Sequence, residues 1–137
     1  MATDLIRVLI VDDNKDLTSI ISRLFMQYAD IIPVGTANNG QEALHMICKG
    51  KIDVVLLDII MPGMDGMQVL EQIMQMGDKR PAIIILSAIG SNDMIKRVLD
   101  LGADYFLVKP VDATTMIEKI RLAHKAHRGF KLTKVDI

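Results

Sequence analysis

The sequence is poor in aromatic residues and in cysteine: its 137 residues include no tryptophan, two tyrosines, three phenylalanines and one cysteine. The single Cys48 cannot form an internal disulfide, and we expect it to be buried with Leu44 and Ile47 in the apolar stripe of a helix. The formal net charge of −1 argues against a nucleic-acid-binding surface that covers the whole domain.

Long hydrophobic runs are also missing, although half of the residues are hydrophobic. The apolar residues form short blocks with charges nearby, whereas a membrane-spanning helix needs roughly 20 consecutive apolar residues. The N-terminus carries an acid, Asp4, and leads straight into an apolar block, without the basic start and cleavage site of a secretory signal. We therefore expect no membrane segment and a cytoplasmic location.

Short β-branched runs alternate with helical patterns five times along the chain. We expect strands at residues 6–11, 31–36, 53–58, 82–87 and 104–108. Runs that are apolar at every position indicate strands covered on both faces. The pattern predicts an α/β fold: a doubly wound, five-stranded parallel sheet in the flavodoxin-like order 2-1-3-4-5, with helices on both faces. Pro33 cannot donate to a ladder, which places the second strand at an edge.

Residues that favour helix starts follow the first four predicted strands. We expect helices to begin near Asn14 or Asp16, after 38–40, after 65–66 and at 91–93. Each segment carries apolar residues three or four positions apart, as a helix with one face on the sheet does. A fifth helix is expected around residues 116–123 and to end at Gly129, because glycine favours helix C-termini.

Residues that could bind or accept a phosphoryl group lie at the ends of four of the predicted strands. Asp12 and Asp13 follow the first strand, and Asp58, Ser87 and Lys109 end or follow the third, fourth and fifth. In an open parallel sheet the carboxyl ends of the strands form the site, so we expect these side chains to meet in one cleft.

Three carboxylates brought together raise one another's proton affinity unless a cation compensates. Mg²⁺ prefers oxygen ligands, so Asp12, Asp13 and Asp58 suit it. The alternative for the adjacent pair alone is a solvated turn or a helix cap. The presence of Asp58 and Lys109 at equivalent strand ends favours the metal site.

Four segments of the chain, in this order, resemble the receiver domain of two-component response regulators. They are residues 11–14 (VDDN), 57–66 (LDIIMPGMDG), 86–88 (LSA) and 102–110 (GADYFLVKP). The resemblance extends from residue 6 to about residue 126. Within the family, residues 57–62 and 100–106 are most similar to receivers of the sporulation-initiating phosphorelay regulators of spore-forming bacteria.

The resemblance implies that Asp58 is the phosphoacceptor, which attacks a phosphohistidine of a sensor histidine kinase or a histidine phosphotransferase. It implies a Mg²⁺ ion, replaceable by Mn²⁺, bound by Asp12, Asp13, Asp58 and the backbone carbonyl of Ile60. Lys109 would neutralise charge on the phosphoryl oxygens, and its bond to Pro110 would be cis. The protein would then be no enzyme for other substrates, but a regulator that catalyses its own phosphorylation and dephosphorylation.

Signalling in such a protein requires two competing arrangements. The resemblance implies that the Ser87 hydroxyl turns to the phosphoryl group and that Phe106 swings into the space vacated. The readout surface would be the fourth helix, the fifth strand and the fifth helix, with phosphorylation-dependent dimerisation as one output. Ile60 and Ile89 lie two residues after Asp58 and Ser87 and cannot orient an attacking water by hydrogen bonding, so we expect a long-lived acyl phosphate.

The C-terminal region is rich in basic residues. Between residues 119 and 134 there are six, with no acid: Lys119, Arg121, Lys125, Arg128, Lys131 and Lys134. A solvated helix face explains them, and a docking strip or a linker is the alternative. We expect a receiver domain at residues 1–126, with residues 127–137 as a tail or the start of a linker to a DNA-binding output domain. The chain has no helix-turn-helix of its own and would not bind DNA directly.

The sequence leaves other functions open. The chain is either a stand-alone receiver, acting as a phosphorelay intermediate, or part of a longer regulator, which the resemblance favours. A Mg²⁺-dependent phosphatase with an aspartyl nucleophile would place two acids two residues apart after the first strand, which the adjacent Asp12 and Asp13 do not match. A flavodoxin-like FMN carrier would need a phosphate loop at residues 12–16, where carboxylates repel phosphate. The histidines, His45, His124 and His127, are expected on helix surfaces.

Overall fold

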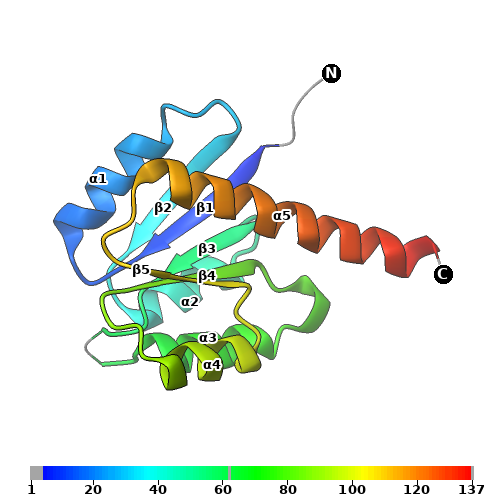
Figure 1. The fold of residues 1–137 in the computed structure, drawn as a ribbon. Coiled ribbons are helices and arrows are strands. Elements are labelled where there is room, and N and C mark those ends of the chain that lie inside the picture. The colour runs from blue at the N-terminus through cyan, green and yellow to red at the C-terminus, as the bar shows by residue number, and fades with distance from the viewer. Residues whose placement is uncertain (1–4, 62, 137) are drawn as a thin grey trace.

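The protein forms one five-stranded parallel sheet with helices on both faces (Figure 1). The computed structural model describes the backbone of residues 5–61 and 63–136, and side chains as far as His127. The strands are β1 (Ile6–Val11), β2 (Ile31–Ala37), β3 (Val54–Leu57), β4 (Ala82–Ser87) and β5 (Tyr105–Val108). Their order is β2-β1-β3-β4-β5, and every neighbouring pair is parallel. The predicted fold class and strand order are therefore confirmed.

The helices divide between the two faces of the sheet. They are α1 (Lys15–Phe25), α2 (Gly40–Cys48), α3 (Gly66–Met74), α4 (Asn92–Leu101) and α5 (Ala113–Asp136), with a short 3-10 turn, η1 (Gly77–Lys79), before β4. The helices α1 and α5 cover one face, and α2, α3 and α4 cover the other (Figure 1). None of these helices, within the described part of the chain, is long and apolar enough to span a membrane.

Each face of the sheet has its own hydrophobic core. Alternate residues of one strand point to opposite faces, so Leu9 and Val11 belong to the core under α2 and α3, whereas Val8 and Ile10 belong to the core under α1 and α5. All residues of β3 and β4 are buried. Double coverage explains why these strands are apolar at every position.

Side-chain caps begin four of the helices at the predicted places. Asn14 accepts a hydrogen bond from the Leu17 amide at 3.1 Å, and the side chains of Asn39, Asp65 and Ser91 accept the equivalent bond in α2, α3 and α4. Each cap binds an amide that has no partner within its helix. These caps place the helix starts next to the carboxyl ends of the strands.

The second strand lies at the edge of the sheet, as Pro33 predicted. Pro33 pairs with Val8, and the register shifts between Val8 and Leu9. An irregular pairing of this kind accommodates a residue that has no amide hydrogen.

Two predictions about helices are wrong. Cys48 is exposed, because Ala43 and Ile47 form the buried face of α2 and a residue one position further is turned by about 100°. Gly129 does not end the fifth helix, which continues to Asp136. Glycine in a helix interior costs only about 1 kcal/mol, so it favours an end without requiring one.

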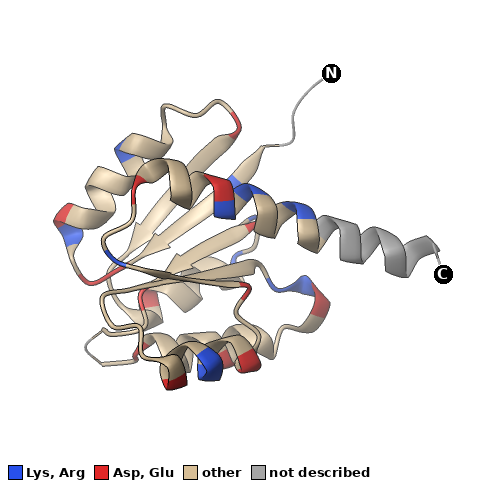
Figure 2. Cartoon of the chain, in the orientation of Figure 1, with Lys and Arg blue, Asp and Glu red and all other residues tan. Residues whose placement is uncertain are grey.

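The basic residues near the C-terminus contact the domain where their side chains are described. Arg121 forms two hydrogen bonds with Asp30, at 2.8 and 2.9 Å, and the ammonium of Lys119 lies 5.4 Å from the centre of the Tyr105 ring. Arg128, Lys131 and Lys134 lie outside the described side chains. In the described part of the chain, α5 carries both basic and acidic residues (Figure 2). These contacts favour an ordinary helix surface for Lys119 and Arg121.

The histidines differ from the expected surface positions in two of three cases. His45 is exposed, but His124 and His127 are half-buried. His127 lies 3.3 Å from Asp104, and Nε2 of His124 is buried without a hydrogen-bond partner in the described structure. Both residues lie on the inner face of α5, four positions after the buried Ile120 and Ala123.

Candidate functional site: an acidic cleft with a lysine

Two adjacent central strands, β1 and β3, deliver the two buried carboxylates of the site. The Asp58 amide donates to the Val11 carbonyl at 2.9 Å, which continues the pairing of β1 with β3 by one residue. Asp12 and Asp58 are 3% and 6% exposed, and they are the only buried acids among the residues that the structure describes. Burying a carboxylate costs free energy unless the charge is paired or hydrogen-bonded. The groups that compensate these two acids therefore define the site.

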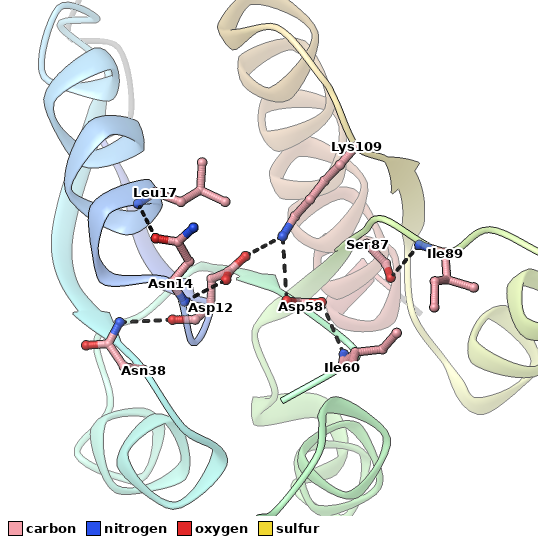
Figure 3. Close-up of polar contacts among 9 residues, drawn as sticks. All are labelled: Asp12, Asn14, Leu17, Asn38, Asp58, Ile60, Ser87, Ile89 and Lys109. Carbon is pink, nitrogen blue, oxygen red and sulfur yellow. Dashed lines mark hydrogen bonds and ion pairs between the residues drawn. The ribbon is translucent and has the colours of Figure 1, made fainter. Parts of the chain in front are cut away.

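Backbone amides hold one oxygen of each buried carboxylate. The Asn14 amide donates to Oδ1 of Asp12 at 3.0 Å, and the Ile60 amide donates to Oδ1 of Asp58 at 3.1 Å. In both cases the amide lies two residues further along the chain, so each acid closes a tight turn of its own loop. The other oxygens, Oδ2 of both residues, are left to face Lys109 (Figure 3).

Lys109 connects the two buried acids. Its ammonium lies 2.6 Å from Oδ2 of Asp12 and 3.5 Å from Oδ2 of Asp58. Partial burial alone would lower the pKa of Lys109, but the hydrogen bond to Asp12 and the charges of both acids outweigh it and raise the pKa above its ordinary value. Lys109 is therefore charged at neutral pH. The peptide bond between Lys109 and Pro110 is cis.

The surroundings of Asp58 disfavour its charged form. Burial raises its pKa, and the charge of Asp12 adds to this, while the Ile60 amide and Lys109 oppose it without cancelling it. A carboxylate that is incompletely compensated gains from a further cation nearby. The electrostatics therefore favour a metal ion or another positive group next to Asp58.

Asp12, Asp13 and Asp58 form a cluster able to hold such an ion. One carboxylate oxygen from each lies within 4.8 Å of the others, and Asp13 is exposed. Three clustered carboxylates match the oxygen preference of Mg²⁺, which also keeps several of its waters. The donor set fits the ion expected from the sequence.

Ser87 and Phe106 lie on the strands beside the acids. Ser87 is fully buried at the end of β4, and its Oγ accepts a hydrogen bond from the Ile89 amide at 3.2 Å (Figure 3). Phe106 is half-buried on β5 and packs on the core under α2, α3 and α4. Ile60 and Ile89, by contrast, are 47% and 51% exposed in the loops that follow Asp58 and Ser87.

Two residues that support the site were not singled out from the sequence as site residues. Asn38 donates from Nδ2 to the Asp12 carbonyl at 2.9 Å and so ties the loop after β2 to the loop after β1. Gly66 donates to the Ile59 carbonyl at 2.9 Å, and its Cα lies so close to the backbone of Asp58 and Ile59 that a side chain there would overlap it. The segments 38–40 and 65–66 signalled turns, but a turn signal does not reveal which backbone lies against it.

Comparison with known proteins agrees with this geometry. A family model described as the response regulator receiver domain matches residues 8–121. Among solved structures, the receiver domain of the Francisella response regulator 1452 is 30% identical, with a TM-score of 0.79 over 88% of this chain and 97% of that chain. The response regulator domain of Thermotoga maritima CheB is also 30% identical, with a TM-score of 0.81 over 88% and 97%.

A third structure is a complex, CheX-CheY-BeF3-Mg from Borrelia burgdorferi. The matching chain is 34% identical, with a TM-score of 0.77 over 84% of this chain and 86% of that chain. The family match spans the acidic pair, the buried Asp58 and Lys109, which are the residues that meet at this site. The chain therefore belongs to the response regulator receiver domain family.

Proposed function

We propose that this chain is a phosphorylatable signalling switch in which Asp58 accepts a phosphoryl group from a phosphohistidine of a partner protein. The observation that carries the proposal is the position of the Lys109 ammonium between Asp12 and Asp58. A cation there would neutralise the incoming phosphoryl oxygens, because it lies next to the carboxylate that would carry them. Receiver domains as a family are phosphoacceptors that also hydrolyse their own phosphoryl group.

The transfer would occur by attack of an Asp58 carboxylate oxygen on phosphorus. The P–N bond to the donor histidine breaks, its electron pair stays with the imidazole nitrogen, and an acyl phosphate forms on Asp58. The Ile60 amide orients the carboxylate through Oδ1. Lys109 pairs with Asp58 before the reaction and would pair with the phosphoryl oxygens afterwards.

Asp12, Asp13, Asp58 and the backbone carbonyl of Ile60 would hold a Mg²⁺ or Mn²⁺ ion. When bound, the ion supplies positive charge to the phosphoryl oxygens. The clustered carboxylates support this, and so does the magnesium named for the CheX-CheY complex of Borrelia burgdorferi.

Ser87 and Phe106 would convert phosphorylation into a change at the surface. The Ser87 hydroxyl would leave the Ile89 amide for the phosphoryl group, and Phe106 would move inward into the space vacated. The half-buried position of Phe106 supports this, because full burial of a Phe side chain is worth about 1.5–3 kcal/mol, enough to bias a switch. The readout surface would then be α4, β5 and α5.

The donor would be a sensor histidine kinase or a histidine phosphotransferase, in the cytoplasm. We place the receiver domain at residues 1–126 and treat residues 127–137 as a tail or the start of a linker. The output would be a DNA-binding domain or a target protein outside this chain, which would itself bind no nucleic acid. The amino-acid sequences of residues 57–62 and 100–106 support a transcription regulator of the sporulation phosphorelay type. Such a regulator would dimerise on phosphorylation.

Incubation with acetyl phosphate and Mg²⁺, followed by intact-mass measurement, tests the proposal. We expect the wild-type protein to gain one phosphoryl group and Asp58→Asn to gain none, because an amide is a poor nucleophile. Asp16→Asn, which alters an exposed acid on α1, is the matched control and should be phosphorylated normally. Omission of Mg²⁺ should abolish the gain. Phosphorylation of Asp58→Asn, or turnover of free phosphomonoesters, would contradict the proposal.

A further inference from the structure

The loop between β4 and α4 lies directly against β5 at a residue without a side chain. A Cβ at Gly90 would lie 2.6 Å from Cγ2 of Val108, closer than carbon atoms of different residues approach, and 3.6 Å from Cε1 of Phe106. Gly90 is not among the glycines with a positive φ, which are Gly50, Gly63, Gly77 and Gly102. A side chain at position 90 would therefore force Val108 to shift, because of the space there and not because of the backbone conformation.

The same loop holds the Ser87 hydroxyl. The Ile89 amide, next to Gly90, donates to Oγ of Ser87 at 3.2 Å, and the Ser87 carbonyl accepts from the Lys109 amide at 2.8 Å. Ser87 and Val108 are also partners in the register of β4 and β5. The loop that lies against Val108 therefore also carries the amide that binds the Ser87 hydroxyl.

We propose that Gly90 is a positioning residue of the switch: its contact with Val108 and Phe106 holds the loop in the arrangement in which Ser87 is bound to the Ile89 amide. This inference rests on the proposed function, because it assumes that Ser87 and Phe106 are the parts that move. Val108 is well suited to set the distance, since a β-branched side chain in a strand has little freedom at χ1. The helix that follows adds little restraint, because Val98 is the only fully buried residue that α4 contributes among the described residues.

A methyl group at position 90 would disfavour the resting arrangement and leave the competing one unhindered. The population should then shift towards the arrangement in which Ser87 is released. By linkage, a change that favours the phosphorylated arrangement also favours phosphorylation at equilibrium. The rate should rise as well, because a larger fraction of the molecules is already in the arrangement that reacts. We expect Gly90→Ala to be phosphorylated by acetyl phosphate about fivefold faster than wild type, at the lower end of typical couplings between sites.

The full chain labelled with 4-fluorophenylalanine provides a direct readout at Phe106. The sequence has three phenylalanines, and the resonance of Phe106 is identified by its loss in Phe106→Leu. In unphosphorylated Gly90→Ala, this fluorine resonance should move from its wild-type position towards the position seen in phosphorylated wild type. Gly35→Ala, on the far edge strand β2, is the matched control, because a Cβ there would overlap only the terminal methyl of the flexible Met46 side chain.

A second variant tests the contact itself. Val108→Ala removes the one atom that a Cβ at position 90 would overlap, and the remaining neighbours lie at ordinary contact distances of 3.6 Å or more. The double variant Gly90→Ala/Val108→Ala should therefore return the Phe106 resonance and the phosphorylation rate to those of Val108→Ala alone. General destabilisation of the fold would not be reversed by a second large-to-small change.

Three results would overturn the inference: an unmoved Phe106 resonance in Gly90→Ala, a shift that persists in the double variant, or a shift that leaves the phosphorylation rate unchanged. The first two comparisons use unphosphorylated protein, so they test the contact even if wild type gains no phosphoryl mass. A wild-type protein that is not phosphorylated would refute the proposed function instead, and the two failures are distinguishable.

Discussion

Lys109 combines two contacts that the proposed switch uses at different stages. At rest its ammonium compensates Asp12 and Asp58, at 2.6 and 3.5 Å. After phosphorylation it would hold the phosphoryl oxygens next to the strand that carries Phe106. Loss of the ammonium should therefore impair the coupling of phosphorylation to the surface more than phosphorylation itself.

We predict that Lys109→Ala is still phosphorylated by acetyl phosphate, about a hundredfold more slowly, the effect of removing one donor from a stabilised oxyanion. The phosphorylated variant should show no movement of the Phe106 fluorine resonance. Intact mass measures the first effect and the resonance measures the second. Full movement of Phe106 in phosphorylated Lys109→Ala would refute the role assigned to the lysine.

In the proposed switch, Ile60 and Ile89 would flank the phosphoryl group on the solvent side. Both are about half exposed and offer no side-chain hydrogen bond to an attacking water. We predict a slowly hydrolysed acyl phosphate in wild type, and hydrolysis about tenfold faster in Ile60→Asn, because a polar side chain there orients water. Loss of phosphoryl mass over time in Mg²⁺ measures both rates.

Ile20 provides the control for this comparison, since it is equally exposed, at 48%, but lies on α1. Ile20→Asn should leave the lifetime unchanged. A wild-type half-life of seconds would show that the isoleucines do not protect the acyl phosphate.

At the scale of elements, the start of α3 supports the turn that carries Asp58. The Cα of Gly66 lies against the backbone of Asp58 and Ile59, and that backbone cannot move aside as a flexible side chain would. We predict that Gly66→Ala displaces Asp58, lowers the Tm by several degrees and slows phosphorylation by at least about tenfold, because a small misplacement of a reacting group is costly.

The matched control is Gly35→Ala, where the added methyl meets only the end of the Met46 side chain. Thermal unfolding and the acetyl phosphate assay are measured for both variants. Equal behaviour of the two would mean that α3 does not position Asp58.

The elements were predictable where local chemistry decides them. Asn14 and Ser91 cap their helices through a side-chain oxygen that is visible in the sequence, and Pro33 excludes a central strand by lacking a donor. Cys48 and Gly129 were predicted wrongly because each depends on more than local preference. The exposure of Cys48 depends on how α2 is rotated against the sheet, and a helix passes through Gly129 at a small cost.

The site shows the same division. The convergence of Asp12, Asp13, Asp58 and Lys109 follows from parallel strands that end at one edge, and the structure brings these residues together as predicted. The close approach of Gly90 to Val108 is absent from any local pattern, because it depends on the distance between a loop and a neighbouring strand. A contact of this kind is visible only in the three-dimensional structure.

At the scale of the whole molecule, a second polar cluster lies at the amino ends of β4 and β5, whereas the site lies at the carboxyl ends of the strands. Asp104, just before β5, accepts from the Ile83 amide at 2.8 Å and from Arg80 at 3.2 Å, and lies 3.3 Å from His127 on α5. The Asp104 amide in turn donates to the Ile83 carbonyl at 2.8 Å. The Asp104 carboxylate therefore joins β4, β5 and α5 at the end of the sheet away from the site.

This cluster makes stability depend on pH in a predictable direction. Burial raises the pKa of Asp104, but the hydrogen bonds from His127 and Ile83 and the charge of Arg80 outweigh it and hold the pKa below its ordinary value of 3.8. A lowered folded-state pKa contributes stability that is present above the unfolded value and is lost as the pH falls through the folded value. The contribution is therefore complete at neutral pH and disappears in acid.

We predict that Asp104→Asn is less stable than wild type by about 1–2 kcal/mol at pH 7, because it removes a hydrogen-bonded charge. The difference should begin to shrink as the pH falls below about 3.8, the unfolded-state value, and should be lost as the pH falls through the lower folded-state value. Urea unfolding at pH 7 and at lower pH measures it, with Asp16→Asn as the exposed-acid control. A difference that stays constant with pH would assign the effect to packing. Phosphorylation of Asp58 should be unaffected at pH 7, because this cluster holds the strands together at their amino ends, whereas Asp58 follows the carboxyl end of β3.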